Sequence, residues 1–263
     1  MSEQPEASPE ELARQLRQYL DSFRAAGVCW LPVSGEPAAS AAGLEMSPTR
    51  QLTPPVHHLV DSATPVQSDI EPRRQELTVL AERVSRCQRC TELVVSRSRT
   101  VFGVGPIDPE LCFVGEAPGA TEDQRGEPFV GDAGQLLDRI LAACGMKREE
   151  VYICNICKCR PPGNRLPTAQ EAGNCREYLD RQLELVRPKF ICALGACASQ
   201  NLLGTSLGIG KLRGRFHDYK GIPVMCTYHP ASLFPGRSPQ NKKLVWEDMK
   251  QLLERMGRPI PRR

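Results

Sequence analysis

The sequence predicts an α/β fold of three layers, α/β/α, in which helices cover both faces of a central four-stranded parallel sheet. Short apolar segments of strand length alternate along the chain with longer segments whose apolar residues recur at helical spacing. Such alternation favours a parallel sheet that is buried on both faces. The predicted strand ends carry Gly115–Gly119, Asn155, Gly195 and His229-Pro230. Ligands of such sheets bind beyond the carboxyl ends of the strands, so we expect an active site there.

The predicted elements begin at about residue 73. The strands are apolar runs over residues 111–114, 151–156, 190–194 and 222–227. The helices have amphipathic patterns over residues 73–86, 134–144, 168–186, 196–203 and 244–256. The helix over 168–186 has the clearest start, because Thr168-Ala169-Gln170-Glu171 has the form of a capping box.

Residues 1–72 form an N-terminal extension to the domain expected over residues 73–258, and residues 259–263 form a tail. A short helix is predicted over about residues 9–26, where a capping box precedes leucines at helical spacing. The Pro-, Ala- and Ser-rich stretch that follows is expected to be a disordered linker. The helix is either an appendage without a partner or a segment that docks in the groove of a protein partner. The sequence does not decide between these two interpretations.

Composition excludes some classes of protein. The net charge of +3 excludes a histone-like polycation but allows a local basic surface. The chain opens without a signal-peptide pattern, and no apolar run is long enough to span a membrane, so we expect a cytoplasmic protein. In a reducing compartment the twelve cysteines favour metal ligands over disulfides.

Cys87 and Cys90 form a C-x2-C pair, which is half of a four-thiolate metal site. One candidate second pair is Cys154 with Cys157, but an extended strand directs these two side chains to opposite faces.

The other candidate second pair is Cys159 with Cys175, which flank a Pro-rich loop and a helix start. A four-cysteine set with uneven spacing suits either a [4Fe–4S] cluster or zinc. The remaining cysteines stand mostly in apolar contexts and are expected to be small buried hydrophobes: Cys29, Cys112, Cys144, Cys192, Cys197 and Cys226.

Several spaced motifs between about residues 75 and 255 resemble the family 4 uracil-DNA glycosylases. The motifs are Gly115-Glu116-Ala117-Pro118-Gly119 with Glu122-Asp123, Pro128-Phe129-Val130-Gly131, Gly134-Gln135-Leu136-Leu137, Asn155-Ile156-Cys157-Lys158-Cys159-Arg160-Pro161-Pro162 and His229-Pro230-Ala231-Ser232-Leu233. The resemblance implies a uracil-DNA glycosylase-like fold and a monomeric DNA-repair enzyme. Such an enzyme hydrolyses the N-glycosidic bond of deoxyuridine in DNA, releases uracil and leaves an abasic site.

The resemblance also implies a cofactor, a [4Fe–4S] cluster held by Cys87, Cys90, Cys159 and Cys175. A related branch that crosslinks itself to DNA has a Gln in the first motif and an inserted basic segment with a nucleophilic His. This chain has Glu116-Ala117 and no His between residues 160 and 175, which favours ordinary turnover.

Residues of these motifs suit the chemistry of a flipped base. Phe129 is expected to stack on the ring, and the Asn155 amide to donate to uracil O4 and accept from N3–H. His229 is expected to donate to uracil O2 as negative charge develops on the leaving base. Glu116 is the candidate catalytic carboxylate, which orients water or stabilises the positive sugar. Glu122 is expected near uracil C5, where it helps to exclude thymine.

Each of these residues also has a structural interpretation, as a core phenylalanine, a turn asparagine, a packed histidine or a loop carboxylate. The candidate contacts to the DNA backbone are basic residues, several of them near glycines: Lys158, Arg160, Arg165, Lys211, Arg213, Arg215 and Arg237. Leu233-Phe234 is the candidate wedge into the base stack.

Three alternatives stand beside this prediction. The first is a glycosylase of altered base preference, such as one for deaminated purines, and the second is a non-catalytic iron–sulfur module that binds nucleic acid or carries electrons. The binding module would not require Glu116, Asn155 and His229 together at three strand ends. The third is a zinc protein, which an absorption spectrum would distinguish.

Overall fold

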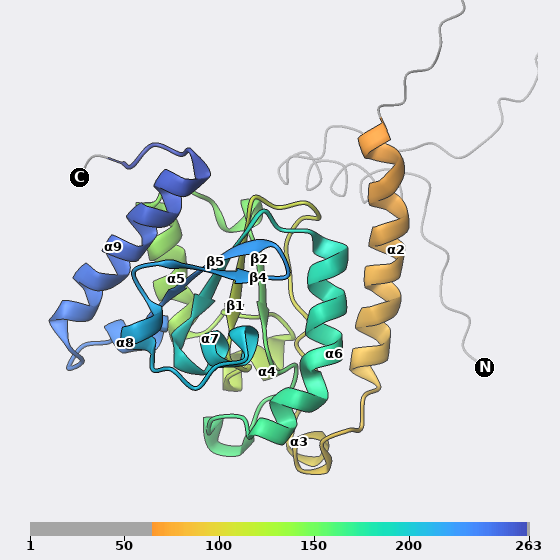
Figure 1. The fold of residues 1–263 in the computed structure, drawn as a ribbon. Helices are drawn as coiled ribbons and strands as arrows, with labels where there is room; N and C mark the ends of the chain where they lie inside the picture. Colours follow the sequence, from red (N-terminus) through yellow and green to blue (C-terminus); the bar gives the residue numbers. More distant parts are fainter. Residues whose placement is uncertain (1–64, 262–263) are drawn as a thin grey trace, which may run out of the picture. The chain divides into compact units, whose positions relative to one another are not determined.

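The computed structural model describes residues 65–261, and Figure 1 shows their ribbon. The helix expected over residues 9–26 lies outside these residues, as does most of the expected linker. The first described helix, α2 (Pro65–Ser85), begins inside the stretch expected to be linker, rather than at residue 73. No helix in the described part of the chain is long and apolar enough to cross a membrane.

The central sheet has five strands in the order β2-β1-β3-β5-β4. The strands are β1 (Leu111–Gly115), β2 (Tyr152–Asn155), β3 (Phe190–Leu194), β4 (Phe216–Tyr219) and β5 (Ile222–Thr227). The parallel arrangement of β2, β1, β3 and β5 is confirmed, but the predicted number of four strands is wrong. An antiparallel edge strand, β4, pairs with β5 in a hairpin. Its sequence, Phe-His-Asp-Tyr, has only one buried residue and lacks the apolar run that marks the other strands.

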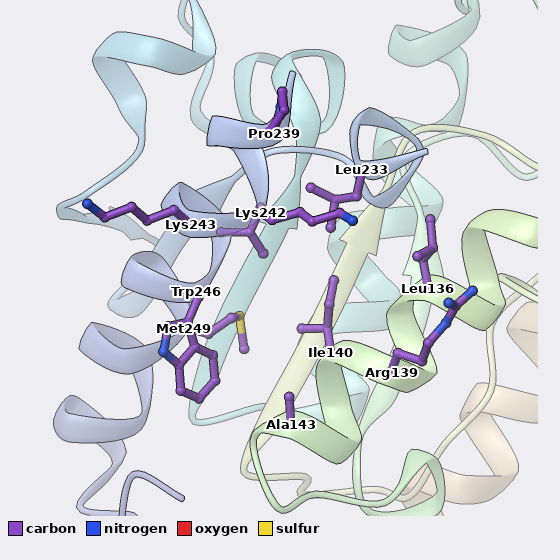
Figure 2. A pocket seen from close by; sticks show the side chains of 11 residues that line it. Leu136, Arg139, Ile140, Ala143, Leu233, Pro239, Lys242, Lys243, Trp246 and Met249 are labelled. Atoms are coloured by element: carbon purple, nitrogen blue, oxygen red, sulfur yellow. The ribbon is translucent and has the colours of Figure 1, made fainter. Parts of the chain in front are cut away.

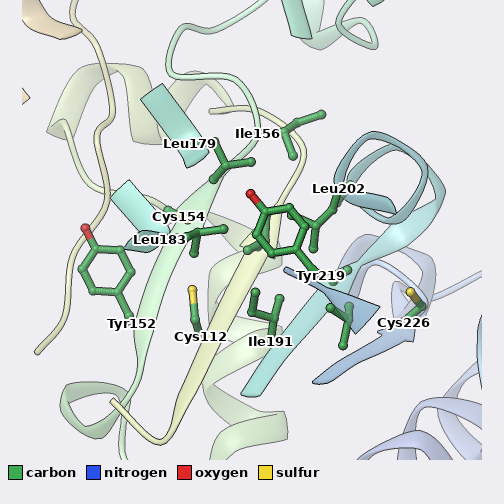
Figure 3. Close-up of a cluster of buried hydrophobic side chains, with 14 of the residues drawn as sticks. Cys112, Tyr152, Cys154, Ile156, Leu179, Leu183, Ile191, Leu202, Tyr219 and Cys226 are labelled. Atoms are coloured by element: carbon green, nitrogen blue, oxygen red, sulfur yellow. The ribbon is translucent and has the colours of Figure 1, made fainter. Parts of the chain in front are cut away.

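Helices cover both faces of the sheet, which confirms the three layers. On one face α6 (Ala169–Val186) and α7 (Gly195–Leu203) pack against side chains such as Cys112, Ile191 and Val224 (Figure 3). On the other face α5 (Asp132–Ala143) and α9 (Pro239–Met256) pack against alternate residues of the same strands. Side chains of neighbouring strand residues point to opposite faces, so apolar strands bury both.

Helix ends follow local signals where the sequence carries them. The capping box of α6 is confirmed: the Glu171 N–H donates to Thr168 Oγ1 at 3.2 Å, and the Thr168 N–H donates to the Glu171 carboxylate at 2.8 Å. The start of α9 at Pro239, rather than at residue 244, was missed because its first turn is polar. Short helices, of six residues or fewer, are not predicted because they are too short for apolar residues to recur at helical spacing: α3 (Thr91–Ser96), α4 (Ala120–Arg125), α8 (Ile209–Leu212), η1 (Arg148–Glu150), η2 (Pro162–Asn164) and η3 (Pro230–Leu233).

Helix α2 packs on the outside of α6, as Figure 1 shows. Leu80 and Val84 of α2 are buried against Tyr178 and Leu185 of α6. This small satellite core extends the domain beyond the three layers, and it brings the end of α2 to the segment that contains the first cysteine pair.

Candidate active site

The carboxyl ends of the parallel strands surround a cavity of about 530 Å³. Gly115 and Asn155 are register partners at the ends of β1 and β2, and His229 follows β5. The cavity is lined by Glu116, Ala117, Pro118, Gly119, Glu122, Phe129, Ala133, Asn155, Pro161, Asn164, Arg165, Leu166, His229, Ala231 and Arg237. The structure therefore brings together the predicted residues Glu116, Glu122 and Phe129 with Asn155 and His229.

Asn155 presents an unsatisfied hydrogen-bond acceptor to this cavity. The residue is 1% exposed, and its Oδ1 atom is buried without a hydrogen-bond partner among the described residues. A buried amide oxygen without a partner is destabilising by about 1–3 kcal/mol, so it indicates a site that a ligand completes. The missing partner is an N–H or O–H donor, because a carbonyl oxygen only accepts.

Phe129 is held close to Asn155 by an unusual backbone conformation. Its φ is 53°, in the left-handed region, and its ring centroid lies 5.7 Å from that of His229. A side chain on Gly115 would lie 2.5 Å from the Phe129 ring and would also clash with Asn155 Oδ1. Gly134 leaves room for the Phe129 backbone in the same way. These glycines are required for the close approach of the ring to the amide.

Glu122 fixes the loop that carries Phe129. Its Oε1 accepts the N–H groups of Val130 at 2.9 Å and Gly131 at 2.7 Å, and its Oε2 accepts the Gly119 N–H at 3.1 Å. The carboxylate lines the cavity, yet both of its oxygens are bonded to the backbone. We assign it a role in positioning the loop, and its expected place near uracil C5 stays a prediction.

His229 is a neutral hydrogen-bond donor in this setting. Burial lowers the pKa of its imidazole to about 4, although the nearby Glu122 carboxylate acts in the opposite direction. Its Nδ1 atom accepts the Ala231 N–H at 3.2 Å, so the single proton of the neutral ring resides on Nε2. A neutral Nε2–H is suited to stabilise an oxyanion without giving up its proton.

Glu116 is half-buried on the cavity wall, and burial raises the pKa of its carboxyl group, while a hydrogen bond with Cys197 lowers it. Burial, together with the nearby Glu116 carboxylate, raises the pKa of the Cys197 thiol to about 12. The thiol therefore stays protonated and donates a hydrogen bond to the carboxylate. Asn201 lies behind the thiol and donates to its sulfur at 3.7 Å. Cys197 was expected to be only a buried hydrophobe. Its position in the sequence, two residues after the Gly195 that follows β3, could have identified Cys197 as a residue of the active site.

The expected DNA contact of Lys158 is wrong, because this residue is 1% exposed. Its Nζ donates to the Asn155 carbonyl at 2.8 Å and to Gln182 Oε1 at 2.5 Å. Gln182 in turn donates to the Tyr152 hydroxyl at 2.9 Å. This buried network supports the backbone of Asn155 from below the cavity.

Two predicted DNA contacts are instead engaged in ion pairs. Arg213 donates to both oxygens of the fully buried Asp248, at 2.7 and 3.0 Å, and thereby joins α8 to α9. Arg165 donates to both oxygens of Glu171 at 2.8 Å and to Glu92 at 3.0 Å. These two arginines stabilise the fold through their ion pairs. The paired carboxylates largely compensate their positive charge.

The expected wedge was Leu233-Phe234, and the structure does not expose Leu233, whereas Phe234 is half-buried and stays a prediction. The Leu233 side chain is 8% exposed and belongs to the core on the α5 and α9 face. Figure 2 shows it at the border of a second cavity, of about 540 Å³, between α5 and α9. Trp246 and Met249 line the same cavity, whose rim carries Lys242. Leu233 therefore lines this second cavity and not the active-site cavity.

The remaining basic candidates stay at the surface. Arg237 and Lys211 are exposed, and Arg237 lines the active-site cavity. Arg160 is half-buried, and its guanidinium donates to Asn164 at 2.8 Å on the cavity wall. Arg215 is exposed next to the Arg213 ion pair.

The four cysteines expected to bind a cluster lie near one another. Burial, followed by the proximity of Cys175 and Cys87, raises the pKa of Cys90, although the Asn174 amide lowers it. The same two thiols are neighbours of Cys159, whose pKa burial raises to about 11. In the described part of the chain, however, no group of three or more His, Cys, Asp or Glu side chains is arranged to hold a metal ion.

Donors surround these sulfur atoms, as the chemistry of a thiolate site requires. Arg97 donates to Cys159 Sγ at 2.9 Å, and Asn174 donates to Cys90 Sγ at 3.3 Å. A hydrogen bond from the Cys157 thiol, aided by the backbone N–H of Lys158, lowers the pKa of Cys175 to about 6. Hydrogen bonds to sulfur are a usual feature of iron–sulfur sites, so this donor set fits a cluster.

Comparison with known proteins agrees with the fold and the cavity. A family model described as the uracil DNA glycosylase superfamily matches residues 102–250. The Type-4 uracil-DNA glycosylase of Thermotoga maritima is 42% identical over 68% of this chain and 94% of its own length. That of Archaeoglobus fulgidus is 40% identical over 71% of this chain and 96% of its own length. The Type-5 uracil-DNA glycosylase of Pyrobaculum aerophilum is 33% identical over 57% of this chain and 80% of its own length. The chain therefore belongs to the uracil DNA glycosylase superfamily.

Proposed function

We propose that this protein is a uracil-DNA glycosylase of DNA repair, which hydrolyses the N-glycosidic bond of deoxyuridine, releases uracil and leaves an abasic site. One observation carries the proposal, the buried Oδ1 of Asn155 without a partner at the floor of the cavity. Uracil supplies the missing donor through its N3–H. Cytosine has an unprotonated N3 at the same position and leaves the oxygen unsatisfied, which disfavours its binding.

Phe129 and His229 complete the recognition of the base. The ring of Phe129 stacks on the flipped uracil, and base–aromatic stacking contributes about 1–3 kcal/mol. His229 donates from Nε2 to uracil O2. As the bond between C1′ and N1 breaks, its electron pair moves to the base, and negative charge accumulates on N1 and O2. A fixed neutral donor at this position stabilises that charge at its origin.

Glu116 acts on the sugar side of the breaking bond. Its half-buried carboxylate orients the water whose oxygen bonds to C1′, and it stabilises the positive charge that develops on the sugar. The water proton passes to the carboxylate, and the uracil anion leaves. The thiol of Cys197 donates to the carboxylate and keeps it oriented toward the cavity.

DNA approaches the rim of the cavity. The exposed cations Arg237 and Lys211, together with Arg160, contact phosphates and provide affinity that depends on salt. The resemblance to family 4 implies that the active form is a monomer.

Cys87, Cys90, Cys159 and Cys175 hold the [4Fe–4S] cluster in this proposal. The support is the resemblance of the cysteine spacing to family 4 and the donors that face the sulfurs. The four cysteines would hold the cluster from three parts of the chain, which are the segment after α2, the segment that follows Asn155, and α6. In that role they would restrain the loop that begins at Asn155.

The test is uracil release by the full chain from an oligonucleotide that contains one labelled uracil, in single-stranded and duplex form. The protein is first shown to have the brown colour and broad visible absorption of an iron–sulfur cluster. We expect uracil and an abasic site as products. A cluster-loaded protein that releases no uracil from either substrate contradicts the proposal, and a colourless protein with zinc contradicts the cofactor.

A further inference from the structure

We infer that Leu166 is the residue that enters the base stack when uracil leaves it. This inference rests on the proposed function and replaces the predicted wedge Leu233-Phe234. The Leu233 side chain is buried in the core, and the half-buried Phe234 is not part of the lining of the active-site cavity. Within residues 69–261, the large hydrophobic side chains that are exposed are Val79, Val95, Val104, Leu166 and Leu207. Leu166 is the member of that set that lines the active-site cavity.

An exposed leucine at the rim of the cavity is suited to the space that a flipped base leaves. Leu166 is 65% exposed, whereas Phe129, which lines the same cavity, is 6% exposed and already packed. Flipping breaks the stacking of the uracil with both neighbours, which makes extrusion unfavourable. An apolar side chain that fills the gap restores part of that contact and holds the base outside the duplex.

The backbone at Leu166 is fixed from both sides, so little order is lost when the side chain inserts. On one side the Arg165 guanidinium donates to the Leu166 carbonyl at 3.0 Å and also donates to the Glu171 carboxylate. On the other side Pro167 restricts the backbone, and the Thr168 N–H donates to the same Glu171 carboxylate at 2.8 Å. One buried carboxylate therefore anchors the residues before and after the leucine.

The loop before Leu166 turns tightly enough to place it at the rim. Gly163 and Asn164 both have positive φ, of 63° and 57°, and the Asn164 side chain accepts from Arg160 at 2.8 Å. The Arg165 charge is compensated by Glu171 and Glu92, so this arginine is not the group that contacts DNA here. The apolar side chain next to it is the part of the loop that remains available.

The experiment compares Leu166→Ala with wild type in single-turnover uracil release from one sequence, as single strand and as duplex. Removing a wedge matters where a stack has to be opened. We expect a loss of about ten-fold or more on the duplex and at most about three-fold on the single strand. Leu166→Phe, which keeps an apolar side chain, should retain most of the duplex rate. Leu207→Ala is the matched control, since Leu207 is 41% exposed and lies away from the cavity.

A second measurement follows flipping directly. 2-Aminopurine placed beside the uracil in the duplex brightens when its neighbour unstacks, and this signal should weaken for Leu166→Ala. Equal losses on both substrates, or no loss on the duplex, would overturn the inference while uracil release by wild type still supports the proposed function. Release by wild type from single strands alone would also overturn it. A wild-type protein inactive on both substrates would remove the proposed function itself and the inference with it.

Discussion

The floor and the rim of the active-site cavity are built in different ways. The floor consists of Asn155, Phe129 and His229, which carry no charge and are held by backbone contacts and close packing. The rim contains the paired Arg165, the exposed Leu166 and the exposed Arg237. In the proposed function, selectivity resides in neutral side chains at the floor, whereas attachment to DNA resides in a few side chains at the surface. The predictions below separate these two regions.

Apart from the Asn155 variant that is described last, the largest effect is expected at His229. Replacement by Ala removes the donor that faces uracil O2, and loss of one preorganised donor typically lowers the rate by about 10²–10³-fold. Single-turnover uracil release from a single-stranded substrate measures this effect without the step of duplex opening. A rate within a few-fold of wild type would assign the histidine a purely structural role.

Gly115→Ala should narrow the floor. The new methyl group meets the Phe129 ring and the Asn155 amide oxygen, and displacement of reacting groups by about 1 Å lowers the rate by about 10²-fold. Gly173→Ala is the matched control, because a methyl group there has no neighbour within 4 Å. Uracil release and thermal unfolding of both variants check the prediction. Equal activities would mean that the floor tolerates the methyl group.

Replacement of Arg213 should affect the stability of the protein, whereas replacement of Arg237 should affect its binding to DNA. Arg213→Ala leaves the buried Asp248 carboxylate without its positively charged partner, so the free energy of unfolding should fall by about 3–5 kcal/mol. Arg237→Ala should leave stability unchanged and reduce the slope of log affinity against log salt by about 1. Denaturant unfolding and DNA binding at several salt concentrations distinguish the two residues. A weakened salt dependence for Arg213→Ala in a stable protein would reverse their assigned roles.

The smallest effect concerns pH. Burial raises the pKa of Glu116, so uracil release should fall as pH decreases through that raised value, and Glu116→Gln should give a flatter, lower profile. His229 has a folded-state pKa of about 4, below its ordinary 6.5, so the unfolded chain binds more protons between these values. Stability should therefore decrease as pH falls from 6.5 toward 4, and less so in His229→Gln. Unfolding at pH 7 and pH 5 measures the difference.

The sequence predicts the floor of the cavity better than it predicts the contacts to DNA. Asn155 is the last residue of β2, and His229 lies two residues after β5. The carboxyl ends of parallel strands meet at one edge of the sheet, so the convergence of the two residues can be predicted from the order of elements. The family resemblance adds Phe129, whose positive φ no sequence pattern indicates.

The contacts to DNA were predicted less well, because the environment of a charged side chain depends on partners that are distant in the chain. Lys158 is buried through Gln182 and Arg213 is paired with Asp248, and neither partner belongs to a motif. Leu233 lies only four residues after His229, yet η3 turns its side chain into the core. The edge strand β4 was missed for a related reason, since its exposed residues leave no apolar run.

The central claim is that the unsatisfied amide of Asn155 selects uracil, and Asn155→Asp tests it most directly. The aspartate removes the donor to O4 and places an oxygen against it, so we expect uracil release to fall by about 10³-fold or more, with residual activity weakened or shifted toward cytosine. Release from matched oligonucleotides that contain one uracil or one cytosine is measured for both proteins. A variant that releases uracil at the wild-type rate would contradict the account.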